Sequence, residues 1–85
     1  LVNVKNTDFS AQISISPNPA SELITIRTEV LFERVQMFSA TGRLLRVVEQ
    51  PGQQTRISVS ELPAGTYFLR FVKDNAAWTT PVVKM

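Results

Sequence analysis

Apolar and polar side chains alternate along most of this chain with a period of two. Ile24 and Ile26, for example, alternate with Thr25 and Arg27. Because successive side chains of an extended strand point to opposite faces, this alternation predicts β-strands that bury one face. The residues expected to point inward in seven such segments are Ile13 and Ile15; Ile24 and Ile26; Val35 and Met37; Leu45 and Val47; Ile57 and Val59; Tyr67, Leu69 and Phe71; and apolar residues between Trp78 and Val83.

Turn-forming residues separate these segments at intervals of about 8 to 12 residues, which is typical of small all-β domains. Proline fixes φ and lacks an N–H, so Ser16-Pro17-Asn18-Pro19 predicts an extended turn between two strands. Gly42 is expected at a positive φ in a hairpin turn, a conformation that glycine adopts without steric cost. These signals predict an all-β fold, an immunoglobulin-like antiparallel β-sandwich of about seven short strands, with a five-strand barrel as the alternative.

The last predicted strand contains Pro81, which cannot donate a backbone hydrogen bond to a neighbouring strand. We therefore expect this strand to lie at the edge of a sheet or to carry a bulge. An edge strand leaves backbone N–H and C=O groups free for a partner. The last strand is thus a candidate for recognition by another protein, and edge strands could also pair in a homodimer.

The composition of the 85 residues argues against catalysis. The sequence has no cysteine and no histidine, which removes disulfides, thiolate metal sites, the usual zinc ligand and the commonest general base. Its seven carboxylates are spread singly over the chain and form neither an adjacent pair nor a calcium-binding loop. We expect no enzyme activity, no cofactor and no bound metal.

The charge pattern argues against a nucleic-acid partner. The formal net charge is +2, and the nine lysines and arginines are scattered along the sequence instead of forming one run. No apolar stretch approaches the ~20 residues that a membrane-spanning helix needs.

Residues 1–11 are mostly polar, with isolated apolar side chains, so we expect a linker without strands. The chain starts at Leu1 without a methionine or a leader sequence, which favours a piece of a longer protein with a further domain upstream. The predicted organisation is a linker over 1–11 and a β-sandwich over 12–85.

Several short motifs follow one another in a recognisable order. A Pro-Asn-Pro step precedes the strand of Ile24 and Ile26, a Gly-Arg turn follows Val35 and Met37, and a Leu-x-x-Gly-x-Tyr step precedes the penultimate strand. A short apolar and basic tail ends the chain. In this order the motifs resemble the type A C-terminal sorting domain of the type IX secretion system, also called the Por secretion system, of Bacteroidetes. The resemblance covers about residues 13–85, and it departs from the family in Thr79-Thr80-Pro81 and in Met85 after Lys84.

The resemblance implies a targeting module without catalytic residues. Such a domain directs its upstream cargo from the periplasm across the outer membrane to the cell surface or the medium. It implies outer-membrane components of the secretion system as partners, and a sortase that would cut in the linker. The residues that carry the recognition signal by this resemblance are Pro17, Asn18, Pro19, Gly42, Arg43, Gly65, Tyr67, Val82, Val83 and Lys84. We expect capture of the tail as an edge strand, with Val82, Val83 and Lys84 supplying backbone donors, apolar contacts and one charge.

Simpler interpretations stand beside these. Pro17, Asn18 and Pro19 could be only a rigid turn, Arg43 only a solvated side chain, and Tyr67 only a core residue. Trp78 could be core or an exposed anchor, and Phe32 and Phe68 could form an apolar patch for a dimer partner.

Two other classes of function remain open from the sequence. A structural or adhesive immunoglobulin-like domain would carry an exposed apolar or aromatic patch. A small carbohydrate-binding module would need Trp78, Tyr67 and Phe68 on one exposed face, which their alternating positions disfavour.

Overall fold

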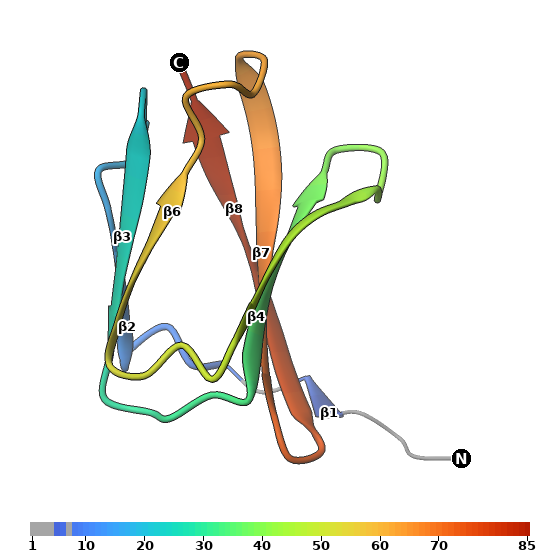
Figure 1. Cartoon of the computed structure of the whole chain (residues 1–85). Helices are drawn as coiled ribbons and strands as arrows, with labels where there is room; N and C mark the ends of the chain where they lie inside the picture. Colours follow the sequence, from blue (N-terminus) through green and yellow to red (C-terminus); the bar gives the residue numbers. More distant parts are fainter. Residues whose placement is uncertain (1–4, 7) are drawn as a thin grey trace.

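The computed structural model describes residues 5, 6 and 8–85 of the chain (Figure 1). Over these residues no helix is long and apolar enough to cross a membrane. The described part contains eight β-strands, which are β1 (Lys5–Asn6), β2 (Ile13–Ser16), β3 (Leu23–Thr28), β4 (Arg34–Ser39), β5 (Leu44–Glu49), β6 (Gln54–Ser58), β7 (Gly65–Lys73) and β8 (Ala76–Lys84).

The strands form two sheets that face each other (Figure 1). The large sheet has the order β1-β8-β7-β4-β5, and the small sheet has the order β2-β3-β6. Neighbouring strands are antiparallel, except that β1 runs parallel to β8. The predicted all-β sandwich is therefore confirmed, and the barrel alternative is not formed. Strands β2–β8 correspond to the seven predicted segments, whereas β1 was not predicted.

The inward faces of the two sheets form one hydrophobic core. Ile24 and Ile26 from β3 meet Met37 from β4 and Leu69 and Phe71 from β7, and each of these side chains is at most 2% exposed. Burying one such side chain contributes about 1.5–3 kcal/mol to the transfer free energy that drives folding. The period-two pattern predicted these inward positions correctly.

Strand β5 departs from the prediction because it carries a bulge. The register between β4 and β5 shifts after Met37, so Met37 lies opposite Arg46 and Phe38 lies opposite Leu44. Leu45 is the extra residue of β5, without a partner in β4. One extra residue exchanges the inward and outward positions of the side chains on one side of the bulge. Leu45 does pack against the core, but Val47 is 44% exposed, so its predicted inward position is wrong. Val48 packs against the core instead.

A row of aromatic rings connects Phe9, in the N-terminal segment, to the last strand. Phe9 meets Phe32 edge-on at a centroid distance of 5.0 Å, Phe32 lies 5.2 Å from Phe71, and Phe71 lies 5.9 Å from Trp78. Phe32 is only 3% exposed, so it cannot join Phe68 in a surface patch, and that prediction is wrong. Trp78 is half-buried on the inward face of β8, opposite Phe71.

The N-terminal segment takes part in the sandwich. The predicted linker over 1–11 falls partly on residues 1–4 and 7, which lie outside the described residues. The expectation that the segment has no strand is wrong, because β1 pairs with Ala76 and Ala77 of β8. Phe9 also packs against the core.

Candidate functional site

The end of strand β8 is held by the turn that contains the Pro-Asn-Pro step. The side-chain Oδ1 of Asn18 accepts a hydrogen bond from the backbone N–H of Val83 at 3.0 Å. The N–H of Ala20 donates to the C=O of Val83 at 2.8 Å, and the N–H of Met85 donates to the C=O of Ala20 at 2.8 Å. We call this arrangement the clasp. It joins the connection between β2 and β3, both in the small sheet, to the last strand of the large sheet.

The local sequence explains which groups make the clasp. Pro17 and Pro19 have no N–H to donate, and the Ser16–Pro17 and Asn18–Pro19 peptide bonds are both cis. Because the two prolines lack an N–H, the amide side chain of Asn18 and the backbone of Ala20 supply the polar groups that reach β8. Ala20 is 1% exposed and belongs to the hydrophobic core, so the turn is anchored by packing as well as by hydrogen bonds.

Strand β7 supports the tail from its other side. Gly65 lies opposite Lys84, and Tyr67 lies opposite Val82. The Tyr67 side chain is 7% exposed, which confirms its core position, and its hydroxyl donates to the C=O of Pro63 at 2.5 Å. Gly65 has a φ of +151°, a conformation that a residue with a Cβ rarely adopts. The tyrosine hydrogen bond and the glycine thus fix the start of β7 beneath the tail.

The Gly-Arg turn joins β4 to β5. Gly42 has a φ of +91°, as predicted, and its N–H donates to the C=O of Ser39 at 2.9 Å. Ser39 also exchanges two hydrogen bonds with the backbone of Arg43, at 2.8 and 3.1 Å, and lies opposite Tyr67 of β7. The Arg43 side chain is exposed.

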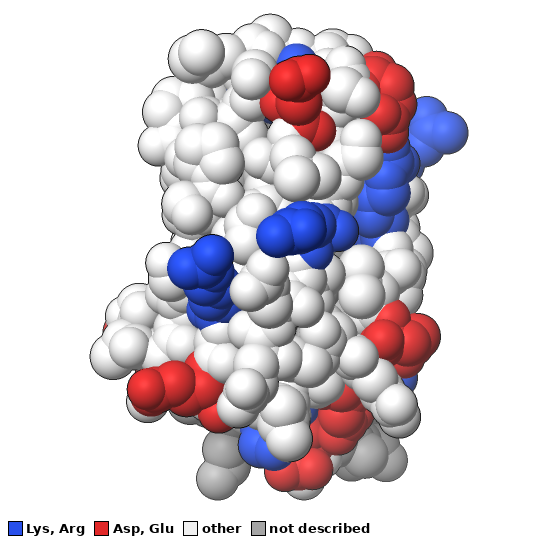
Figure 2. Space-filling view, turned by 60° about the vertical axis from the view of Figure 1, so that its left-hand side comes forward, with Lys and Arg blue, Asp and Glu red and all other residues white. Residues whose placement is uncertain are grey.

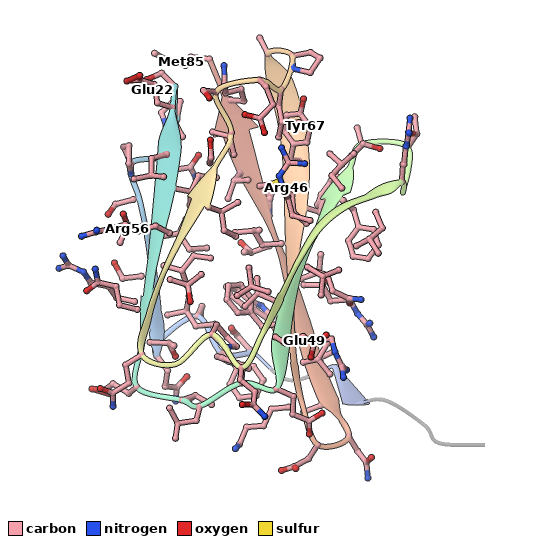
Figure 3. The ribbon with its side chains drawn as sticks, in the orientation of Figure 1. Glu22, Arg46, Glu49, Arg56, Tyr67 and Met85 are labelled. Atoms are coloured by element: carbon pink, nitrogen blue, oxygen red, sulfur yellow. The ribbon has the colours of Figure 1, made fainter. Side chains whose placement is uncertain are left out.

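Most of the predicted signal residues therefore meet at one end of the sandwich. Figure 1 shows the C-terminus, the start of β7 and the β4–β5 hairpin at this end, and Figure 3 shows Glu22, Tyr67 and Met85 there. The clasp brings Pro17, Asn18 and Pro19 to Val83, and the β7–β8 ladder brings Gly65 and Tyr67 to Lys84 and Val82. The Gly42–Arg43 turn lies at the same end but does not contact the clasp through any hydrogen bond found among the described residues.

The prediction of an open last strand needs correction at both ends of β8. β1 pairs with its beginning, and Ala20 bridges to its end at Lys84. Val83 directs both of its backbone groups to the clasp, so they are not free donors and acceptors. Val82 is 2% exposed and is a core residue. Pro81 lies between the two ends of β8. It is two residues before Val83, so its backbone nitrogen points to the same side as that of Val83, away from β7. The missing N–H of Pro81 therefore does not interrupt the hydrogen bonds between β8 and β7.

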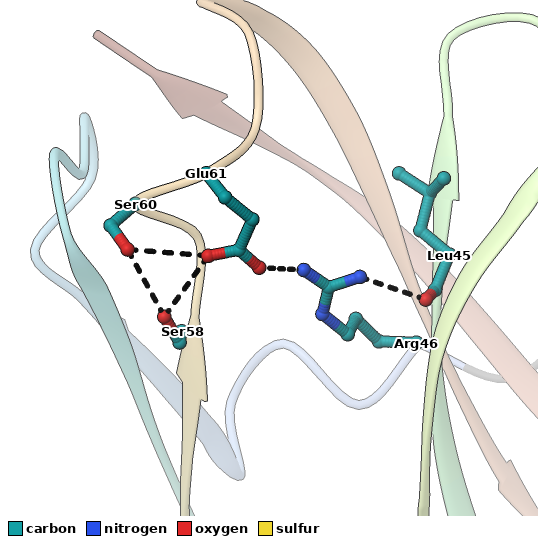
Figure 4. A network of polar contacts seen from close by, with 5 residues as sticks. All are labelled: Leu45, Arg46, Ser58, Ser60 and Glu61. Atoms are coloured by element: carbon teal, nitrogen blue, oxygen red, sulfur yellow. Dashed lines mark hydrogen bonds and ion pairs between the residues drawn. The ribbon is translucent and has the colours of Figure 1, made fainter.

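A second link between the sheets lies at the opposite edge, where β5 faces the end of β6 (Figure 4). The Arg46 guanidinium pairs with the Glu61 carboxylate and also donates to the C=O of Leu45 at 3.0 Å. The hydroxyls of Ser58 and Ser60 contact the other carboxylate oxygen of Glu61, at 3.5 and 3.2 Å. The sequence did not indicate this link, because only the bulge in β5 turns Arg46 inward.

Neither sign of charge forms a large continuous area on the face shown in Figure 2, where basic and acidic side chains are interspersed and in places lie side by side. Among residues 5, 6 and 8–85, no three His, Cys, Asp or Glu side chains gather where they could hold a metal ion. The Ser10 side chain and, to a smaller extent, the hydrogen bond from the Ser10 backbone N–H lower the pKa of Asp8, which is an ordinary effect in a turn.

The three aromatic residues that a carbohydrate platform would need do not share an exposed face. Tyr67 and Trp78 lie on the inward face of the large sheet, where Tyr67 is buried and Trp78 packs on Phe71. Phe68 lies between Tyr67 and Leu69 along β7 and therefore points to the outer face. This arrangement argues against the carbohydrate-binding alternative.

Comparison with known proteins identifies a family and shows a likeness to solved structures. The family model described as secretion system C-terminal sorting domain matches residues 14–85. No curated protein matches significantly. The solved structure of the sulfur carrier protein SoxY from Chlorobium limicola f thiosulfatophilum is similar with a TM-score of 0.63 and 7% sequence identity, covering 99% of this chain and 84% of that one. At this identity the likeness concerns the fold alone.

Proposed function

The chain belongs to the family of secretion system C-terminal sorting domains, and from that premise we propose that it is a folded, non-catalytic targeting domain for its cargo. The family supports a C-terminal sorting signal for type IX secretion, with export across the outer membrane to the surface or the medium. It also implies contact with the type IX secretion machinery. In our proposal the domain folds in the periplasm and is recognised there as a folded unit.

The observation that carries this proposal is the clasp. A signal composed of separate sequence motifs can act as one surface only if the fold brings them together. Here Asn18 and Val83 are 65 positions apart in the sequence and are joined by a hydrogen bond. The tail is consequently part of a folded end of the sandwich, and its recognition would depend on folding of the whole domain.

We further propose that a sortase releases the domain by cutting before Phe9. The aromatic ring of Phe9 packs on Phe32, and the N–H of Gln12 donates to the C=O of Phe9 at 2.9 Å. A peptidase needs an extended backbone segment, and the contacts of Phe9 oppose such a conformation from this residue onward. Lys5 and Asn6 are engaged as well, because they pair with β8, so the cut would fall on the N-terminal side of β1 within the predicted linker.

The proposed function is tested by placing a periplasmic reporter protein in front of residues 1–85 in a bacterium with a type IX secretion system. We expect the reporter on the cell surface or in the medium. The reporter should stay in the periplasm in a strain that lacks the system, and also when the fused domain carries Leu69→Asp. Leu69 is fully buried, so this substitution should unfold the domain. Retention of the unmodified fusion in the periplasm would contradict the proposal.

The obvious deletion of residues 82–85 cannot separate recognition from folding. It removes Val82 from the core together with the two backbone groups of Val83 that complete the clasp. Substitutions of exposed side chains are therefore the sharper tools for finding the recognised surface.

A further inference from the structure

Apolar side chains form a continuous row across four strands on the outer face of the large sheet. Leu44 of β5 lies opposite Phe38 of β4, Phe38 lies opposite Phe68 of β7, and Phe68 lies opposite Pro81 of β8. Val83 follows Pro81 on the same face, since residues two apart in a strand share a face. We call these five residues the outer apolar patch.

The patch is accessible to a partner. Leu44 is 47% exposed and Val83 is 41% exposed, and Pro81 is exposed as well. Phe38 and Phe68 are half-buried between them, so their rings form the floor of the patch. Directly opposite residues on one sheet face lie close enough for their side chains to touch, which makes this a single surface.

The two edges of the large sheet, on either side of the outer apolar patch, are poorly suited to recognition by addition of a partner strand. At the end of β8, the clasp takes both backbone groups of Val83, and Pro81 has no N–H. At the other edge, β5 carries the bulge at Leu45 and the inward charge of Arg46, two features that discourage an added strand. What remains for a partner at this end of the molecule is the side-chain surface between the two edges.

Charge and size indicate what kind of partner fits. Arg43 precedes Leu44 at the hairpin tip, and Arg70 follows Phe68 on the same face of β7, so cations border the patch. A complementary surface would present apolar side chains bordered by carboxylates. Five residues are far fewer than the roughly 20–30 per side of a stable interface, so the contact fits a transient partner better than a permanent dimer.

We propose that the outer apolar patch is the surface through which an outer-membrane secretion component, with an apolar and acid-bordered docking face, recognises the folded domain. This inference rests on the proposed function and adds to it the face that is recognised. In this arrangement the clasp has a positioning role, because it holds Val83 and Pro81 in register with Phe68.

The test uses the reporter fused to residues 1–85 and three single substitutions of exposed apolar residues. Leu44→Asp and Val83→Asp place a carboxylate in the patch, and we expect each to lower the secreted fraction by at least tenfold. Leu23→Asp is the matched control, because Leu23 is 40% exposed but lies on the small sheet, opposite Ser58 of β6. It should leave secretion unchanged. Equal losses for all three variants would overturn the inference.

Folding is checked separately on each purified variant by thermal unfolding followed by circular dichroism. If Val83→Asp does not fold, Val83→Thr replaces it, because threonine keeps the shape of valine and adds only a hydroxyl. Val83→Thr should then lower secretion while the melting temperature stays within a few degrees. Normal secretion of folded Leu44→Asp and Val83 variants would overturn the inference but leave the proposed function standing. Failure of the unmodified fusion to leave the periplasm would instead contradict the proposed function.

Self-association is the other use that such a patch could have, and it gives a distinct result. In sedimentation velocity the unmodified chain should remain a monomer at micromolar concentration. A dimer that Leu44→Asp dissociates would assign the patch to a second copy of the chain and overturn docking to a secretion component. It would also revive the hypothesis of an adhesive domain.

Discussion

Asn18 is the residue on which the candidate site depends most directly. Its side-chain oxygen substitutes for a strand neighbour by accepting the N–H of Val83, which would otherwise have no partner in the β7–β8 ladder. Flanking prolines cannot make a competing backbone hydrogen bond through their nitrogen atoms. The residue type matters because both asparagine and aspartate offer this acceptor, whereas alanine does not.

We predict that Asn18→Ala lowers the free energy of unfolding by about 1 kcal/mol, the typical net contribution of one hydrogen bond. The effect should be local, so the amide of Val83 should exchange with solvent faster while amides in β3 are unchanged. Chemical denaturation and hydrogen exchange measure the two effects. Asn18→Asp keeps the acceptor and should restore slow exchange at Val83. Unchanged exchange at Val83 in Asn18→Ala would show that the clasp does not depend on this bond.

The sequence alone predicted some of these residues and not others. The positive φ of Gly42 follows from its place between two alternating segments, and it was correctly predicted. The contact of Asn18 with Val83 could not be predicted, because periodicity and turn chemistry describe neighbours along the chain. A hydrogen bond between residues 65 positions apart depends on how the two sheets are stacked.

Strand β5 shows how an edge of the sandwich is protected against unwanted pairing. Its bulge at Leu45 disturbs the regular ladder, and Arg46 points inward to pair with Glu61 beyond the end of β6. An inward charge on an edge strand is costly if a second strand covers it, so it disfavours edge-to-edge association. The same bulge explains why the sequence pattern misplaced Val47: one extra residue reverses the faces beyond it, and alternation alone does not reveal which residue is extra.

Arg46→Val should therefore promote self-association through β5. We expect the association constant to rise by about tenfold, which corresponds to about 1.4 kcal/mol. Sedimentation velocity over a range of concentrations measures this change. Arg27→Val is the matched control, because Arg27 lies on β3, the central strand of the small sheet, and offers no free edge. Similar association of both variants would mean that lost surface charge, and not the exposed edge, is responsible.

The two sheets share one core, so the domain should fold as a single unit. Residues from both sheets belong to the same buried cluster, and strand pairs such as β3 with β6 and β4 with β7 join distant parts of the chain. The sequence predicted the strands and most of their inward faces because those depend on local alternation. It could not predict the order of strands, the short β1 or the convergence of the motifs at one end, since these depend on pairing between distant segments.

Such non-local pairing predicts slow folding. For all-β domains with this kind of topology, the main folding phase is expected in the range of about milliseconds to seconds. Trp78 is the single tryptophan of the chain and packs on Phe71, so its fluorescence reports formation of the core. Stopped-flow refolding measures the rate, with far-UV circular dichroism as a second probe. A main phase in microseconds by both probes would contradict this account.

The row of aromatic rings from Phe9 to Trp78 gives the domain a mechanical attachment point. Tension transmitted from the N-terminal side meets β1, which pairs with Ala76 and Ala77 of β8, and then Phe9, whose ring packs against Phe32 and, through Phe71, against Trp78 of the last strand. A force applied to the N-terminal side would therefore load the first residues of β8, while the clasp at the other end of this strand would lie outside the line of force.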